Sequence, residues 1–211
     1  MGPVVPPDDG DDAGPSGSAR DWPGRELLQG RSPREVLAKL CDGDPLELGA
    51  RVDEWLRNEA VLVDPNRAAA RTAARVAYAA MTYRGNPELG LFLTRTIERS
   101  VTELLEEEGE DELARVPIGD VPGAHLLLLW NVLGIELPLA RRASIVCNRE
   151  PREVRRAFVT IAGGEATVRE YATRNGTTEE HVRGLLVRAL RAMAAAVGRP
   201  SLSVEGWDDH G

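Results

Sequence analysis

The side chains that most often bind metals or carry out catalysis are few in this sequence. Its three histidines are His125, His181 and His210, and its two cysteines are Cys41 and Cys147. The cysteines are far apart and have no partners at metal-ligand spacing, and His181 has no cysteine or aspartate at catalytic spacing. A lone histidine in an apolar segment, such as His125, is usually a packed core residue. Two cysteines are too few for a disulfide framework and fit a reducing compartment.

Two further patterns have some features of binding sites. The Gly163-Gly164 pair could cradle a phosphate only with a preceding strand and a following Lys-Ser or Lys-Thr, and neither is present. Residues 103–113 contain seven acidic side chains and no basic one, but a continuous acidic run is more often a solvated face than a metal site. We therefore predict no enzyme activity, no metal and no cofactor.

The most informative spacing lies within residues 148–198. Thr167 and Glu170 have the Ser/Thr-x-x-Glu spacing of a capping box, and Thr177 and Glu180 repeat it ten residues later. Asn175-Gly176 stands between them and is a turn signal. These features predict a short helix, a tight turn and a longer helix, which together make a helix-turn-helix.

Three small or apolar residues suit the crossing of those two helices. Ala172 is small where the helices approach, Gly176 can adopt a left-handed conformation, and Val182 can pack back on the first helix. The second helix then carries one apolar stripe: Val182, Leu185, Leu186, Ala189, Leu190, Met193 and Val197. An ordinary helical hairpin without DNA-binding function remains the alternative.

The stripe predicts which side chains face DNA, because such motifs place the start of the second helix in the major groove. The predicted DNA-binding residues are Arg174, Thr177, Thr178, Glu179, His181, Arg183, Gly184 and Arg188. Thr178, Glu179, His181, Arg183 and Gly184 are expected to face the bases. Arg174, Arg188 and Arg191 are better placed for phosphates. For each arginine, a solvated surface charge is the alternative.

The rest of the chain predicts further helices and no strands, because apolar residues recur at three- and four-residue intervals and no stretch alternates with period two. We expect an all-α protein of two small helical domains joined by a linker. The expected helices begin near Ser32 and span 45–61, 66–82, 88–107, 124–133 and 139–147. The domain boundaries that we predict are a disordered acidic tail 1–30, an N-terminal helical domain 31–108, a linker with an apolar helix 109–147, a helix-turn-helix domain 148–199 and a tail 200–211.

The net charge of −8 conceals an uneven distribution. Residues 1–24 hold five aspartates and one arginine, and residues 201–211 hold three acidic side chains and no arginine or lysine. Residues 149–199 instead contain ten arginines and six glutamates. The acidic average therefore does not exclude nucleic-acid binding by the C-terminal segment.

Three groups of residues within 148–198 form one ungapped pattern. They are Pro151, Arg155 and Phe158; Arg169, Glu170 and Ala172; and Val182, Arg183, Leu186 and Arg188 to Leu190. This pattern resembles the C-terminal DNA-binding domain of bacterial RNA polymerase sigma factors, particularly the small extracytoplasmic-function group. A second segment, from Tyr83 to Leu105, is similar to the end of that family's N-terminal domain. The residues that follow this segment, Glu106 to Glu108, are acidic, whereas the family usually has basic residues there.

The resemblance implies a transcription initiation factor that binds core RNA polymerase and recognises promoter DNA through its helix-turn-helix. Whether an anti-sigma factor also binds is left open. No secretory signal follows Met1, and the apolar stretch 124–137 is too short to span a bilayer. We therefore expect a cytoplasmic protein without a membrane partner. The alternatives are a helix-turn-helix regulator that is not a sigma factor, and a sigma-derived protein-interaction module that binds through 124–139.

Overall fold

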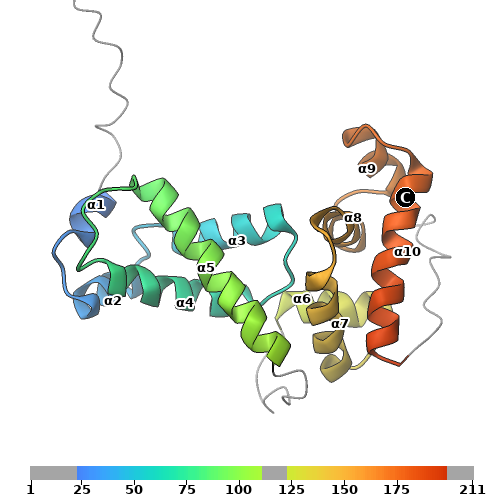
Figure 1. Cartoon of the computed structure of the whole chain (residues 1–211), viewed down its shortest axis with the longest axis horizontal. Coiled ribbons are helices and arrows are strands. Elements are labelled where there is room, and N and C mark those ends of the chain that lie inside the picture. The colour runs from blue at the N-terminus through green and yellow to red at the C-terminus, as the bar shows by residue number, and fades with distance from the viewer. Residues whose placement is uncertain (1–22, 111–122, 199–211) are drawn as a thin grey trace, which may run out of the picture.

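The computed structural model describes residues 23–110 and 123–198, and these residues form helices and no strand. The predicted all-α class is therefore confirmed (Figure 1). The helices are α1 Pro23–Leu28, α2 Pro33–Cys41, α3 Leu48–Glu59, α4 Pro65–Ala79, α5 Leu89–Glu110, α6 Ala124–Leu133, α7 Leu137–Arg149, α8 Arg152–Ala162, α9 Val168–Arg174 and α10 Glu179–Ala196. The predictions for the acidic tail before Pro23 and for the tail 200–211 lie outside the described residues.

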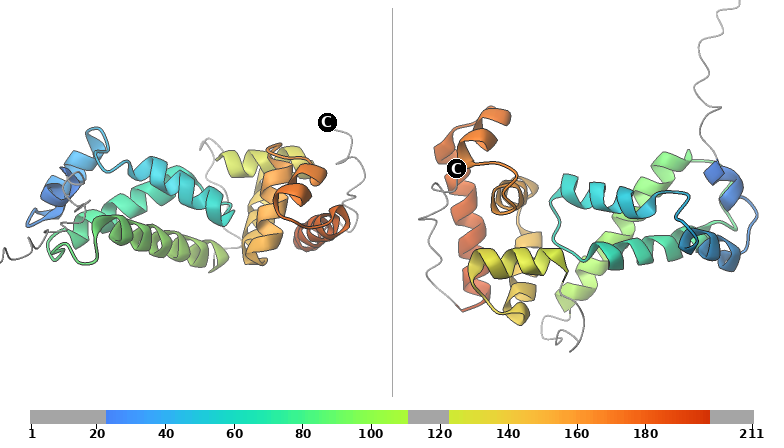
Figure 2. Two further views of the ribbon diagram at one scale, coloured as in Figure 1. Left: turned by 90° about the horizontal axis from the view of Figure 1, so that it is seen from above. Right: turned by 180° about the vertical axis from the view of Figure 1, so that it is seen from behind.

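The helices form two groups, which we call the N-terminal half (α1–α5) and the C-terminal half (α6–α10), at opposite ends of the long axis (Figure 2). In the N-terminal half, α4 packs against α2, α3 and α5. Val76 and Ala77 of α4 are buried with Val36 of α2 and Leu93 of α5. Ser32 begins α2, where the sequence predicted a helix start, and it forms a reciprocal capping box with Glu35.

The predicted start of the N-terminal domain is wrong by several residues. We expected a disordered tail up to residue 30, but Pro23–Leu28 is helical. The side chain of Leu28 is fully buried and packs in the same cluster as Val36 and Val76. Burial of this leucine stabilises by about 1.5–3 kcal/mol, which favours docking of a short helix that the Pro- and Gly-rich composition otherwise disfavours.

The predicted linker 109–147 also differs from the structure. Its residues 124–147 form α6 and most of α7, and these pack into the core of the C-terminal half. Leu129, Ala140, Ala143 and Cys147 are all fully buried, in one cluster with Phe158. The sequence pattern did not predict this packing, because α6 is apolar on nearly every side and so has no face that identifies its partner.

The two halves touch where the loop after α3 meets the junction of α7 and α8. Leu62 belongs to the core cluster of the C-terminal half. Arg155 donates to the carbonyl oxygen of Glu59 at 3.0 Å, and Arg152 pairs with the Glu59 carboxylate at 3.0 Å. The start of α8 is therefore attached to the N-terminal half by charged and backbone contacts.

Candidate nucleic-acid interface

The turn between α9 and α10 closes through two backbone hydrogen bonds. The Thr177 amide donates to the Ala172 carbonyl at 3.0 Å, and the Gly176 amide donates to the Thr173 carbonyl at 3.4 Å. Gly176 is left-handed, with φ of 63°. Together these features are a Schellman motif, which ends a helix and requires a residue that tolerates positive φ. The predicted role of Gly176 in the turn is confirmed.

The cap of α10 is one residue later than predicted. We expected Thr177 to begin a capping box with Glu180, but Thr178 is the N-cap, and its hydroxyl accepts from the His181 amide at 3.2 Å. The Thr177 amide donates to the Ala172 carbonyl in the Schellman motif, so it does not make the reciprocal capping-box bond to Glu180. The first cap is as predicted: Thr167 and Glu170 form a reciprocal capping box.

The packing beneath the turn fixes the angle between α9 and α10. Ala172 and Val182 are both buried, as predicted for a close crossing. They belong to one cluster with Phe158 of α8, which is fully buried, and with Leu186 of α10. Since α8, α9 and α10 contact one another pairwise, the start of α10 is held by two other helices.

The predicted DNA-binding residues lie at or near the surface of this unit. Arg174, Thr178, His181, Gly184 and Arg188 are exposed. Thr177, Glu179 and Arg183 are partly buried. Exposure leaves these side chains accessible to a nucleic acid, but an exposed helix face by itself selects no ligand.

Three of these side chains are paired with carboxylates of the protein itself. His181 Nε2 lies 2.9 Å from Glu153 Oε1, Arg188 Nε lies 2.7 Å from Glu150 Oε2, and Arg183 contacts Glu179 at 3.0 Å.

Sequence reasoning missed the first two contacts, because Glu153 and Glu150 precede their partners by 28 and 38 residues. Both acids lie at the α7–α8 junction. The His181–Glu153 contact is exposed on both sides, and such pairs contribute only about 0–1 kcal/mol, so a phosphate could replace Glu153 at small cost.

Other basic side chains extend the exposed surface around α9. Arg156 of α8 and Arg169 of α9 are exposed, and so is Arg191 of α10. Burial raises the pKa of Tyr171 in α9, and the nearby positive charge of Arg156 opposes that rise. Arg156 is therefore close to α9, and it was not among the residues that we predicted to bind DNA.

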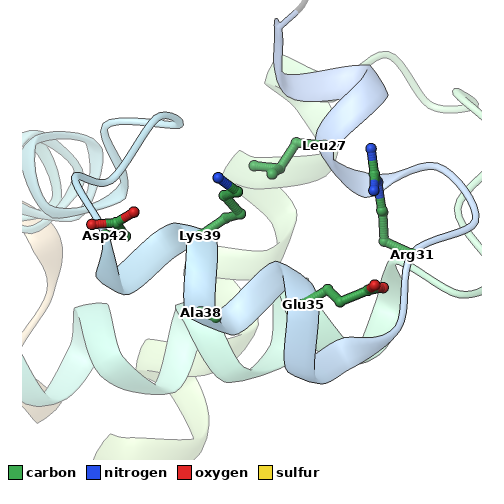
Figure 3. A pocket seen from close by; sticks show the side chains of 6 residues that line it. All are labelled: Leu27, Arg31, Glu35, Ala38, Lys39 and Asp42. Carbon is green, nitrogen blue, oxygen red and sulfur yellow. The ribbon is translucent and has the colours of Figure 1, made fainter.

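A hollow of about 350 Å³ lies between α1 and α2 in the N-terminal half, far from this surface (Figure 3). Its lining residues are Leu27, Arg31, Glu35, Ala38, Lys39 and Asp42. Two are basic and two are acidic, so the hollow selects neither anions nor cations. Glu35 is also engaged in the cap of α2.

Comparison with protein-family models, with curated proteins and with solved structures finds no match to this chain. Among the residues that the structure describes, no helix combines the length and apolar character needed to cross a membrane. Within the same residues, no three His, Cys, Asp or Glu side chains are grouped so that they could hold a metal ion.

Proposed function

We propose that the protein binds double-stranded DNA through α9 and α10 and acts as a cytoplasmic, sigma-like transcription initiation factor. The observation that carries the proposal is the α9–α10 unit, in which a Schellman motif and an N-cap place the start of α10 at an exposed surface. Helix-turn-helix proteins insert the corresponding part of their second helix into the major groove. The sigma-like assignment rests in addition on the sequence resemblance and on the presence of a second helical half.

The chemistry of the surface suggests a division of roles. Thr178, His181 and Arg183 at the start of α10 offer hydrogen-bond donors to base edges, while Arg174 and Arg188 offer positive charge to phosphates. The N-terminal half, with the segment Tyr83 to Leu105, would bind core RNA polymerase. An anti-sigma factor is a further candidate partner of the same half.

A binding experiment tests the DNA part of this proposal. Duplexes that bind the full chain are selected from a randomised pool, and affinity is then measured by fluorescence anisotropy over a range of salt concentrations. Arg174→Ala and Arg188→Ala should each weaken binding and reduce the slope of log K against log salt by about one. Arg34→Ala, at an exposed position in the N-terminal half, is the matched control and should leave both unchanged. Failure to select any duplex would contradict the proposal.

A second function is favoured by one specific observation on α6. Trp130 is 50% exposed on a helix whose Leu129 and Leu133 pack into the core. Exposed tryptophan is enriched in protein interfaces, so an interaction module binding through α6 is the second candidate. This function predicts that Trp130→Ala abolishes binding to a protein partner. It also predicts that the protein does not bind DNA at low salt.

A further inference from the structure

A groove of about 750 Å³ runs along the outer side of the α4–α5 pair. Four arginines line it, Arg71, Arg75, Arg95 and Arg99, together with two glutamates. It lies away from the core side of α4, where Val76 and Ala77 pack against α2. The groove is therefore an exposed, concave surface with an excess of positive charge.

The positive charge is only partly neutralised within the groove. Glu103 pairs with both Arg75 and Arg99, and Glu107 pairs with Arg71. Among the described residues Arg95 forms no ion pair, although its side chain is exposed.

Arg75 carries a further sign of excess positive charge. Its buried Nε has no hydrogen-bond partner. Burial lowers the pKa of Arg75, and the positive charges of Arg99 and Arg71 lower it further. An anionic group in the groove would offset the repulsion between these like charges.

A matching negative charge is present in the same chain. Residues 1–22 hold Asp8, Asp9, Asp11, Asp12 and Asp21 and only one basic residue, Arg20. The segment joins α1, and Leu28 of α1 packs against residues of α4 and α5. Asp12 precedes Pro23 by eleven positions, so extended chain could reach about 36 Å from Pro23.

We propose that the acidic segment Asp8–Asp12 binds in the arginine groove between α4 and α5 of the same molecule. Tethering makes this feasible for a weak interaction, since a short flexible connection gives an effective concentration in the millimolar range. The contact would be electrostatic and therefore sensitive to salt. A consequence is that the segment competes with any other polyanion for this groove. The inference does not depend on the DNA-binding function of α9 and α10.

Paramagnetic relaxation enhancement in the full chain tests the proposal. A nitroxide is attached at Gly10→Cys in a Cys41→Ser background, because Cys41 is exposed, whereas burial raises the pKa of Cys147 to about 12 and keeps it unreactive. We expect the label to broaden the backbone amide signals of Arg95, Thr96 and Arg99. The broadening should disappear at about 1 M salt, where the Debye length falls to about 3 Å.

Matched variants separate this contact from non-specific collapse. A label at Ser203→Cys in the other acidic tail should leave the groove signals unchanged. Arg95→Glu with Arg99→Glu, both at exposed positions, should abolish the broadening from Gly10→Cys. Replacing Asp8, Asp9, Asp11 and Asp12 by Asn should abolish it as well, with the groove itself intact. No broadening of the groove signals, or broadening confined to the C-terminal half, would overturn the proposal.

Discussion

The side-chain amide of Asn148 pairs with both backbone polar groups of Leu62. Asn148 Oδ1 accepts from the Leu62 amide at 2.8 Å, and Asn148 Nδ2 donates to the Leu62 carbonyl at 2.8 Å. Both residues are buried, at 9% and 4% exposure. One side chain near the end of α7 thus provides hydrogen-bond partners for both backbone groups of Leu62, which lies in a loop of the N-terminal half. It lies two residues before Glu150, which holds Arg188 of α10.

Asn148→Ala should therefore destabilise the protein markedly. The substitution leaves the amide and the carbonyl of Leu62 buried without partners, and each unsatisfied group costs about 1–3 kcal/mol. Urea denaturation should show a fall in the free energy of unfolding of at least about 2 kcal/mol. Asn131→Ala, at an exposed position on α6, is the control and should have little effect. Equal stability of the two variants would contradict the assigned role of Asn148.

The cap of α10 can be tested with two neighbouring threonines. Thr178→Ala removes the hydroxyl that accepts from the His181 amide and should cost about 1 kcal/mol. Thr177→Ala should cost much less, because Thr177 contributes its backbone amide to the turn rather than its side chain. Denaturation of both variants measures the difference. A larger loss for Thr177→Ala would restore the cap that we first predicted from the sequence.

Stability should depend on pH through His125. Burial lowers the pKa of His125 to about 4, although the negative charge of Asp64 opposes this. The unfolded chain takes up the proton near pH 6.5, so the free energy of unfolding falls as pH drops from about 6.5 towards 4, by at most about 1.4 kcal/mol per pH unit. Below pH 4 both states are protonated and this contribution becomes constant.

A variant isolates that contribution from other groups. Burial raises the pKa of Glu108, which gives the opposite dependence, because protonation of Glu108 favours the folded state as pH falls. His125→Leu should remove the histidine contribution alone. As the pH falls from 6.5 to 4, the free energy of unfolding of the variant should therefore rise relative to that of the wild type. Urea denaturation across that range measures the difference. Parallel pH profiles for the two proteins would refute the assignment.

The carboxylates at the α7–α8 junction should weaken DNA binding. Glu150 pairs with Arg188 and Glu153 contacts His181, and both acids repel phosphates, so the double variant Glu150→Gln and Glu153→Gln should bind a selected duplex about two- to five-fold more tightly. Glu54→Gln, exposed in the N-terminal half, is the charge-matched control for one substitution. Anisotropy titrations at fixed salt provide the measurement. Unchanged affinity in the double variant would show that these acids do not oppose DNA.

Apart from α1, the order of the helices could be read from the sequence because caps and apolar spacing are local. Ser32, Thr167 and Gly176 identify their helix ends without reference to the rest of the chain. The single-residue error at Thr178 arose because Thr177 has Glu180 at the capping-box spacing, whereas the third residue after the actual N-cap, Thr178, is His181.

Tertiary relationships were beyond the reach of the same reasoning. The pairing of Asn148 with Leu62 joins residues 86 positions apart, and nothing in either local sequence indicates it. The placement of Glu150 and Glu153 beside α10 also depends on how α7 and α8 pack. The surface residues of the candidate site could thus be predicted, but not the carboxylates of the same chain that pair with them.

Reconstituted run-off transcription tests the central claim most directly. Core RNA polymerase is mixed with the full chain and a template that carries a selected duplex upstream of a transcribed region. We predict a discrete transcript that requires the protein and that is lost with Arg174→Ala and Arg188→Ala but retained with Arg34→Ala. Core polymerase that neither associates with the protein nor initiates from the template would contradict the sigma-like assignment.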